Sequence, residues 1–490
     1  MRADAPRLAR APSRRRGRVT EPLAAARASL AGQRAWLVGG ADRDRLLGRA
    51  GDRLDLDIVV DGNVRAAARA IGDAAGGAAF SLSDAFGAWR VVGRDRGWQV
   101  DLTPLLEGSL ARDLAARDLT INALAEPLEG GALVDPHGGA ADLAARVLRM
   151  VSPHAFASDP LRVLRVARLA SELGFSAEPA TLAAAREHAH EVAAVAQERV
   201  FAELKRLLLT ERAVAGLHLM DDLTVTPAVL PELAALHGVE QNRYHHRDVH
   251  GHTLEVLQAT IDLERDPAAV LGAEHAGAVT ELLAEPLADD LTRGGALRWG
   301  ALLHDAAKPR TRIELPGGRI GFPDHDRQGA EMARAALERL RASERLRAHV
   351  AALTRNHLRL GFLVHSAPLD RRAVYRYLVA GGDVPADVTL LSVADRLATR
   401  GRKADEAIEK HLVLARELLG EALAWRAAGR QEPLVRGNAL ARELGLAPGP
   451  HLGELLAEIE EARFAGEIAS PDAAVAYARD LLSRTPAGDR

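Results

Sequence analysis

The 490-residue sequence contains no cysteine. This absence excludes disulfides, cysteine-ligated zinc and thiol catalysis, and it leaves histidine and the carboxylates as the metal ligands to look for. The sequence also lacks an apolar run long enough to cross a bilayer, and the arginine-rich residues 1–18 lack the apolar segment of a secretory signal. We therefore expect a cytoplasmic protein without a membrane partner.

The sequence also lacks a strong net charge. The 64 lysines and arginines nearly balance the 67 aspartates and glutamates, which gives a formal net charge of −3. Any contact with nucleic acid must then come from a local basic surface and not from a global positive field. Aromatic residues make up only 3% of the chain, which is background composition for a helical protein.

The length and the hydrophobic pattern predict several domains. At about 100 to 200 residues per domain the chain forms three or four units. Between residues 35 and 150, short apolar runs alternate with glycine and aspartate turns, which predicts strands in AWLVGG, LDIVV, AWRVVG, WQVDL and ALVDP. Beyond residue 151 the apolar residues recur three and four apart, which predicts helices, for example over 160–173 and 198–209. The run ELPGGRIGF predicts a small hairpin that turns at Gly317 and Gly318.

One candidate site is a set of carboxylates. Asp55 and Asp57 in LDLDIVV lie two residues apart, so on a strand both side chains point to the same face. Asp101 in WQVDL belongs to a later strand-like run, which can lie alongside. Phosphoryl transfer onto a hydroxyl needs two or three carboxylates that hold metal ions at one point. Solvated acids on an edge strand are the structural alternative.

A glycine turn precedes the acid pair. Gly39 and Gly40 end a strand-like run and are followed by Arg43 and a helical stretch. Glycine lets backbone N–H groups approach a triphosphate, and a helix N-terminus favours negative charge. An ordinary strand-to-helix turn is the alternative for this motif alone.

Several motifs together resemble one known family. They are WLVGGADRDRLLG, DLDIVV, DLAARDLTINALA at 113–125, LVDPHGG at 133–139 and DPLRVLRVARLASELGF at 159–175. In this order they resemble the bacterial class II tRNA nucleotidyltransferase and poly(A) polymerase family, and residues 433–468 resemble its C-terminal segment. The resemblance implies addition of C, C and A to tRNA from CTP and ATP with Mg²⁺. No obligate protein partner is evident from the sequence.

The resemblance also implies a fold and roles for single residues. The fold class is α+β, with a polymerase-β-like head followed by mostly helical neck, HD and tail domains. Asp55 and Asp57 would hold Mg²⁺, Asp101 would lie near the attacking hydroxyl, and Gly39, Gly40 and Arg43 would contact the triphosphate. Sugar and phosphate would be braced by Asp113, Arg117, Asp118 and Asn122. The expected domains are a flexible basic arm (1–20), the head (21–150), a nucleotide- and RNA-binding neck (151–225), the HD domain (240–400) and a tRNA-binding tail (401–490).

A pair of residues one helical turn apart is a candidate for choosing the base. An aspartate oxygen accepts from the amino group of C or A, and an arginine donates to the ring acceptor beside it. Asp159 and Arg162 can face one ligand in this way, and residues matching them play that part in the family. Arg165 and Arg168 extend the same face and would otherwise have no partner. The alternative is that Asp159, which precedes Pro160, caps a helix.

A second constellation lies between residues 245 and 400. The ordered series His252, His304, Asp305, His325, His357 and Asp395 resembles the HD phosphohydrolase superfamily. By this resemblance Asp305 bridges two metal ions, either a divalent transition metal or Mg²⁺, and Lys308 contacts phosphate. Such a site hydrolyses phosphoesters, including phosphates at an RNA end; an inherited domain that binds metal for structure is the alternative. We interpret His245, His246 and His250 as bystanders.

Three departures from the family pattern leave other activities open. Only LTPLLEGSLAR separates Asp101 from Asp113, where the family commonly has a longer flexible loop that takes part in switching from C to A addition. Ala116 stands where arginine is common, and Asp42 replaces an apolar residue. Addition of CC alone, A alone or poly(A) therefore stays open. So do an HD phosphohydrolase with an inactive head and a non-catalytic RNA-binding scaffold.

Overall fold

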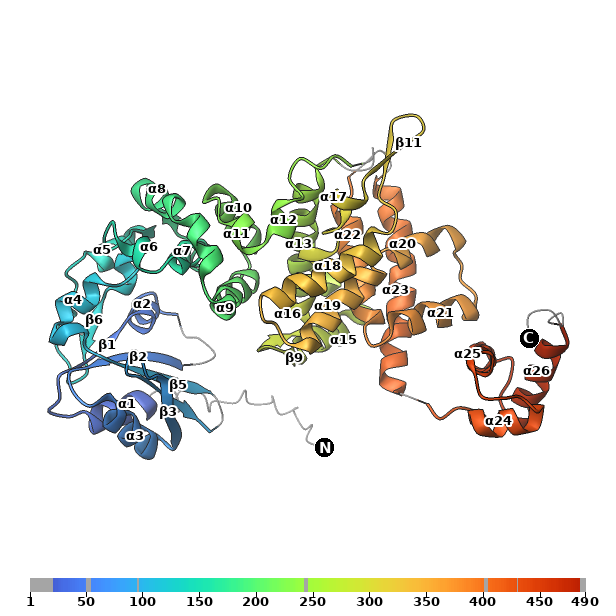
Figure 1. The fold of residues 1–490 in the computed structure, drawn as a ribbon, viewed down its shortest axis with the longest axis horizontal. Coiled ribbons are helices and arrows are strands. Elements are labelled where there is room, and N and C mark those ends of the chain that lie inside the picture. Colours follow the sequence, from blue (N-terminus) through green and yellow to red (C-terminus); the bar gives the residue numbers. More distant parts are fainter. Residues whose placement is uncertain are drawn as a thin grey trace, which may run out of the picture. The chain divides into compact units, whose positions relative to one another are not determined.

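The structure is a computed structural model that describes residues 21–49, 54–94, 97–241, 246–400, 404–429 and 431–484. It divides into two compact units, one of residues 1–195 with 223–225 and one of residues 196–222 with 226–490 (Figure 1). The expected basic arm and His245 lie outside the described residues. Within the described residues, no helix is long and apolar enough to span a membrane.

The first unit is built on a six-stranded sheet in the order β3-β4-β5-β2-β1-β6. Strands β2 and β5 run parallel, and the other pairs are antiparallel. Helices α1 and α3 lie together on one side of the sheet (Figure 1) and share a hydrophobic core with alternate residues of the strands. The strands are β1 (Ala35–Val38), β2 (Leu54–Val60), β3 (Gly77–Ser83), β4 (Ala88–Gly93), β5 (Trp98–Pro104) and β6 (Ala125–Pro127).

Four of the five predicted strands are confirmed, and one is wrong. The run ALVDP forms only an isolated bridge between Val134 and Ala125. The strand cannot extend because the Asp135 carboxylate accepts from the N–H groups of Gly139 and Ala140 and so starts a helix. Strand β3 escaped the prediction because GAAFSLS is rich in alanine and small residues, which favour no strand pattern.

Short helices complete the first unit. They are α1 (Glu21–Ser29), α2 (Gly40–Leu46), α3 (Val64–Ala75), η1 (Leu106–Gly108), α4 (Leu110–Ala115), η2 (Thr120–Asn122), α5 (Gly139–Ala145), α6 (Ala155–Ser158), α7 (Leu161–Leu173), α8 (Pro179–Glu187) and η3 (Ala189–Ala194), with a two-stranded pair β7 (Val147–Leu148) and β8 (Ser176–Ala177). The helix predicted over 160–173 is confirmed as α7.

The second unit is almost entirely helical, as predicted. Its central helix α16 (Arg293–Leu303) is buried along its whole length. Around it lie α9 (Gln197–Leu208), α10 (Ala213–Asp222), α11 (Thr226–Val229), α12 (Pro231–Ala234), α13 (Val249–Arg265), α14 (Pro267–Leu271), α15 (Ala273–Ala284), α17 (Lys308–Thr311), α18 (His325–Arg339), α19 (Glu344–Asn356), α20 (Arg359–Leu363), η4 (Val364–Ser366), α21 (Arg371–Gly381), α22 (Pro385–Ala398) and α23 (Ala404–Ala428).

Two details of this unit bear on the predictions. The hairpin is confirmed as β11 (Ile313–Leu315) paired with β12 (Arg319–Gly321), and Gly317 and Gly318 at its turn have positive φ; a second small pair is β9 (Pro286–Ala288) with β10 (Leu291–Thr292). The C-terminal helices α24 (Gly437–Leu444), α25 (Pro450–Phe464) and α26 (Pro471–Arg484) share a hydrophobic cluster of their own.

Candidate active sites

The three candidate acids of the head lie on one face of the sheet. On β2, Leu56, Ile58 and Val60 pack into the core with α1 and α3, so Asp55 and Asp57 point to the opposite face. The parallel register places Asp57 directly beside Asp101 on β5. The structure therefore brings together the carboxylates that the sequence analysis singled out.

Asp101 has a fixed cationic partner that the sequence analysis missed. Arg90 stands opposite it in the antiparallel register of β4 and β5. Its Nε and Nη2 donate to the two carboxylate oxygens of Asp101, each at 2.6 Å. This pairing holds the carboxylate in one orientation and raises the pKa of Arg90. The signal available in the sequence was the alternation of WRVVG, which puts an arginine on the acid-bearing face.

Asp57 has the electrostatic character of a cation ligand. The protein atoms around it exclude enough water to raise the pKa of its carboxyl to about 6; Arg117 opposes this rise, and the charges of Asp101 and Asp55 add to it. Gly39, at φ +78°, makes room for these groups, because a Cβ there would lie 3.0 Å from Arg117 Nη1 and 3.2 Å from Asp57 Oδ2. A cluster of carboxylates that repel one another fits a divalent cation.

A chain of hydrogen bonds runs behind the acids. Arg43 Nη1 donates to Asn122 Oδ1 at 2.8 Å, Asn122 Nδ2 donates to Asp118 Oδ1 at 3.0 Å, and Arg165 Nη1 lies 3.1 Å from Asp118 Oδ2. Burial alone would raise the pKa of Asp118, but Arg165 and the hydrogen bonds from Asn122 and the Leu119 N–H lower it to about 2. Asp118 is therefore a permanently charged, buried anchor of this chain.

The guanidinium of Arg117 is held near the acids by residues of α4 and η2. Its guanidinium donates to Asp113 Oδ2 at 3.1 and 3.3 Å and to the carbonyl of Asn122 at 3.4 Å. The predicted bracing motif, Asp113 with Arg117, Asp118 and Asn122, is thus one connected network.

The HD series converges in the second unit. His252 lies on α13, His304 and Asp305 follow α16, and His325 begins α18. His357 ends α19 and Asp395 lies on α22. All six side chains meet, although they come from five elements.

Asp305 stands between two groups of ligands, as the bridging hypothesis requires. Its Oδ2 lies 3.1 Å from His304 Nε2 and 3.8 Å from His252 Nε2. Its Oδ1 lies 3.5 Å from His325 Nε2 and 3.9 Å from His357 Nε2. Asp395 Oδ1 completes the first group, 3.0 Å from His252 Nε2. Each group holds enough nitrogen and oxygen donors for one ion.

Three of the histidines are oriented by the same local device. Their Nδ1 atoms hydrogen-bond the carbonyl three residues earlier, which is Ala301 for His304, Phe322 for His325 and Thr354 for His357, at 2.7 to 2.8 Å. This bond fixes the proton on Nδ1 and leaves the lone pair of Nε2 available to a metal ion. The buried His325 Nε2 has no hydrogen-bond partner within the described ranges, as expected for a ligand atom.

Charge in this cluster is strongly coupled. Burial alone would raise the pKa of Asp305, but His304 and Lys308 hold it well below its usual range. Burial, together with the nearby His304, lowers the pKa of His357 to about 4, so this ring is neutral near pH 7 and able to bind metal.

Comparison with known proteins decides the family. Residues 94–149 match the description "Poly A polymerase head domain", residues 174–236 "Probable RNA and SrmB- binding site of polymerase A" and residues 249–400 "HD domain". The chain is 37% identical over 458 residues to an A-adding tRNA nucleotidyltransferase of Deinococcus radiodurans, which covers 92% of this chain and 96% of that protein. The chain belongs to the tRNA nucleotidyltransferase family.

Other relatives agree. A CC-adding tRNA nucleotidyltransferase of Thermus thermophilus is 36% identical over 451 residues, which cover 90% of this chain and 92% of that one. Two solved structures share the fold: a CCA-adding enzyme in apo form, with a TM-score of 0.59, 19% identity and coverage of 94% of this chain and 93% of that chain, and the Thermotoga maritima CCA-adding enzyme complexed with tRNA, with a TM-score of 0.57, 19% identity and 94% coverage of each chain.

In this tRNA nucleotidyltransferase the proposed base-reading pair has structural duties as well. Asp159 Oδ1 accepts from the Leu161 N–H at 3.3 Å, but the N-cap position of α7 belongs to Pro160 and has no side-chain cap, so the helix-capping alternative is not confirmed. Arg162 Nη2 donates to the carbonyl of Ala116 at 2.7 Å, and its Nη1 donates to the carbonyls of Ala155 and Arg117. A role of the pair in base choice stays a prediction.

The prediction that Arg165 and Arg168 would have no partner without a bound nucleotide is wrong. Arg165 pairs with Asp118, and the buried Arg168 Nη1 lies 2.5 Å from Glu172 Oε2. The partner of Arg165 lies outside the helix, at Asp118, whereas the partner of Arg168 is Glu172, one turn further along the same helix α7. Their nucleotide contacts stay a prediction, as does the triphosphate contact of the equally buried Arg43.

The departure at Asp42 changes the interior of the head. Asp42 is fully buried beside the glycine turn, and its Oδ1 lies 3.3 Å from Arg45 Nη2. Burial raises the pKa of Asp42 to about 6, although Arg45 lowers it. The substitution thus puts a titratable group where the family commonly has an apolar side chain.

The side chain of Lys308 is buried and contacts Asp305. Its Nζ is 2.7 Å from Asp305 Oδ2 and also donates to Gln241 Oε1 at 2.7 Å. Gln241 is a residue that the sequence analysis missed, since nothing in its neighbourhood marks it. The predicted phosphate contact of Lys308 stays a prediction.

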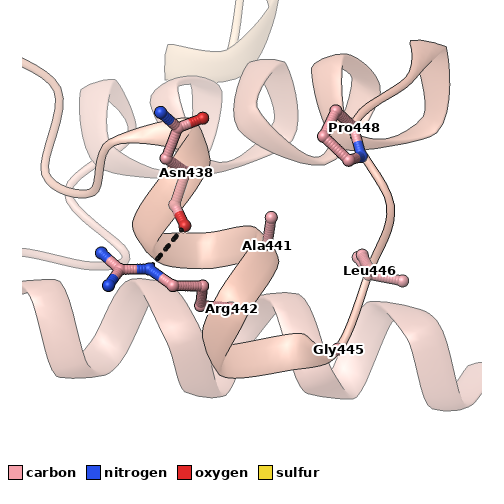
Figure 2. A pocket seen from close by; sticks show the side chains of 6 residues that line it. All are labelled: Asn438, Ala441, Arg442, Gly445, Leu446 and Pro448. Atoms are coloured by element: carbon pink, nitrogen blue, oxygen red, sulfur yellow. Dashed lines mark hydrogen bonds between the residues drawn. The ribbon is translucent and has the colours of Figure 1, made fainter.

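A pocket of about 590 Å³ lies elsewhere, at α24. Figure 2 shows its lining. Arg442 Nε donates to the carbonyl of Asn438 at 3.2 Å on one side of the view, and Gly445, Leu446 and Pro448 lie on the other. No acid or histidine lines it. It coincides with neither candidate site.

Proposed function

We propose that this tRNA nucleotidyltransferase adds two cytidines to tRNA 3′ ends from CTP, as the CC-adding share of CCA synthesis. The connection between Asp101 and Asp113 carries this proposal. It is short and ordered: the Leu105 N–H donates to the carbonyl of Val60 at 3.0 Å, and α4 begins directly after η1. The longer flexible loop with which the family switches to A addition has no counterpart here.

The arrangement of the head suits this chemistry. The RNA 3′ hydroxyl would attack the α-phosphorus in line; the new O3′–P bond forms, the α–β phosphoanhydride bond breaks and pyrophosphate leaves. Mg²⁺ held by Asp55 and Asp57 would supply the charge that neutralises the triphosphate. Asp101, oriented by Arg90, would lie beside the hydroxyl, and Arg117 would meet the phosphates.

We further propose the division of labour expected from the sequence. The head (21–150) performs the transfer, and the neck (151–225) presents Asp159 and Arg162 to the incoming base. The tail (401–490) binds tRNA, and the reaction takes place in the cytoplasm, where its substrates are found. The match of residues 174–236 to the family described as "Probable RNA and SrmB- binding site of polymerase A" supports the role of the neck.

Three other specificities have support of their own. The A-adding relative covers 92% of the chain, which favours addition of the terminal A to tRNAs that already end in CC. Full CCA addition is supported by the CCA-adding enzymes that share the fold. Poly(A) addition has the family description of the head as its support.

One experiment separates these activities. The full-length protein with Mg²⁺ is given tRNAs that lack three, two or one terminal nucleotides, with CTP, ATP or both, and the products are sized. CC addition predicts growth by two nucleotides with CTP alone and no growth of the tRNA ending in CC. Growth of that tRNA by one nucleotide with ATP would establish A addition. Growth of the tRNA that lacks three nucleotides by three, with both CTP and ATP, would establish full CCA addition. A long tail made from ATP would establish poly(A) addition.

The assay needs a matched pair of variants. Asp55→Asn removes a proposed ligand and should abolish extension, whereas Asp73→Asn changes an exposed aspartate on α3, on the other side of the sheet, and should leave extension intact. If no tRNA is extended by the wild type under any condition, the transferase proposal fails.

We propose a second activity for the HD cluster, metal-dependent hydrolysis of phosphates at an RNA end. The observation behind it is the convergence of six donor side chains around Asp305. A divalent transition ion or Mg²⁺ there would supply Lewis-acid activation of water and phosphate. Incubating RNA that ends in a 3′ phosphate with Mg²⁺, Mn²⁺, Co²⁺ or Ni²⁺ tests this: release of phosphate should survive Asp55→Asn and disappear with Asp305→Asn. An unprocessed end with every ion would leave the cluster with a structural role.

A further inference from the structure

A third group of metal-ligand side chains lies outside both sites. Asp221 ends α10, His237 follows α12, and His250 lies in the first turn of α13. The sequence analysis interpreted His250 as a bystander. Asp221 Oδ2 lies 3.2 Å from His250 Nε2 and 3.5 Å from His237 Nε2, and all three donor atoms lie within 4.8 Å of one another. We propose that these three residues form a separate metal site for a divalent transition ion such as Zn²⁺.

The spacing of the donors fits a single ion. Zinc binds nitrogen and oxygen at about 2.1 Å, so the edge of a tetrahedral site between two ligand atoms is about 3.4 Å. The two measured separations, 3.2 and 3.5 Å, lie on either side of this value. An ion can therefore enter with little movement of the three side chains.

The surroundings orient the donors toward a common point. Thr226 Oγ1 donates to Asp221 Oδ1 at 2.6 Å, which turns Oδ2 toward the imidazoles. The side chain of His250 is only 6% exposed, and its Nε2 makes no hydrogen bond to any residue that the structure describes. The His237 and His250 rings stack with centroids 3.6 Å apart, and the Nε2 atom of each ring lies within 3.5 Å of Asp221 Oδ2.

The chemistry of the donors selects the kind of ion. Two imidazoles and one carboxylate suit zinc and its neighbours in the first transition row better than Mg²⁺ or Ca²⁺, which prefer oxygen. The side chain of His237 is 50% exposed, so one side of the site faces solvent. Water can complete the coordination there, and the ion has a route of entry.

The proposed site lies next to the HD cluster along α13, and a bound ion would therefore affect the cluster. His250 precedes the HD residue His252 by two positions on α13. Asp248 caps the same helix by accepting from the Gly251 N–H at 2.8 Å, and it also accepts from the Gly238 N–H at 2.7 Å. An ion on Asp221, His237 and His250 ties the start of α13 to α10 and to the turn at His237. It thereby fixes the helix turn that carries His252.

Metal content tests the proposal directly. The full-length protein is stripped with a chelator, re-equilibrated with Zn²⁺ at low micromolar concentration, desalted and analysed for bound zinc. His237→Gln, at a half-exposed position, should lower the content by about one ion per chain relative to the wild type, and Asp221→Asn should do the same. His246→Gln is the matched control, because His246 is an exposed histidine near Glu255, and it should change nothing.

A combined variant separates this site from the HD cluster. If the sites are independent, the zinc lost with His237→Gln adds to the zinc lost with Asp305→Asn, and melting curves confirm that each variant is folded. In addition, Zn²⁺ should raise the Tm of the Asp305→Asn protein by mass action, and His237→Gln should abolish that rise. Unchanged zinc content in both His237→Gln and Asp221→Asn would overturn the proposal and leave a histidine–aspartate contact without a metal ion.

Discussion

The acid site of the head and the HD site of the second unit are prepared for metals in opposite ways. In the head, Asp55 and Asp57 depend on strands that are distant in sequence, since only the pairing of β2 with β5 brings Asp101 beside them. In the HD site, each of His304, His325 and His357 is oriented by a carbonyl three residues earlier. The first site is therefore set by long-range register, and the second by repeated local geometry within a packed helical core.

The largest effect is expected from a change at the acid site of the head, which should abolish tRNA extension and leave the HD site unchanged. Asp57→Asn should lower tRNA extension by about a thousandfold or more, because a metal ligand at the reacting phosphate supplies several kcal/mol of charge stabilisation. Metal content and hydrolysis at the HD site should not change. Primer-extension rates and bound-metal analysis of the same preparation check both parts; a loss of both activities together would show that the sites are not independent.

The reciprocal change should leave extension untouched. Asp305→Asn removes the carboxylate that contacts both histidine groups, so the protein should lose about one bound ion or more per chain together with any phosphate release. Extension of a tRNA lacking its 3′ end should stay within about twofold of the wild type, a difference too small to reflect a lost catalytic group. Slower extension in a correctly folded variant would mean that the HD site supports the transferase reaction.

A smaller effect is expected from the partner of Asp101. Arg90→Lys keeps the charge but loses the two-pronged hydrogen bond at 2.6 Å. Residues that orient a metal-ligand carboxylate typically contribute ten- to a hundredfold, and we expect a fall in extension of about that size when the carboxylate of Asp101 loses its orienting partner. Arg94→Lys, on the same stretch of chain but beyond β4, is the matched control. Equal rates for both variants would show that Asp101 needs no orientation.

The smallest effect is one of pH. The pKa of Asp57 is raised to about 6, so this carboxyl takes up a proton as the pH falls through that value and then competes poorly for Mg²⁺. At limiting Mg²⁺, extension should fall by about tenfold per pH unit below pH 6, and more Mg²⁺ should move the midpoint to lower pH. A midpoint that ignores Mg²⁺ would point to another group.

Much of this arrangement could be predicted from the sequence, for identifiable reasons. Alternation along LDLDIVV placed Asp55 and Asp57 on one face, and the ordered histidine motifs gave all six residues of the HD cluster. Short-range rules suffice where neighbours two to four residues apart decide the outcome.

What was missed depends on contacts between distant segments. Arg90 meets Asp101 only through strand register, and Gln241 reaches Lys308 from another part of the chain. His250 seemed to be a bystander because Asp221 lies 29 positions before it along the printed sequence. The partner of Arg165 likewise comes from packing, whereas Glu172 stands four positions after Arg168 and could have been predicted from the helical spacing.

The parallel pairing of β2 with β5 also limits how this protein can change. Lengthening the hairpin between β3 and β4 moves neither strand, so insertions there should be accepted over evolutionary time. Deleting a single residue inside β5 would be different: Asp101 would turn into the apolar core, and Leu102 would turn out toward the substrate. The spacing of the acids is thus preserved by the same side chains that keep the head folded, so a chain that loses that spacing also loses its stability.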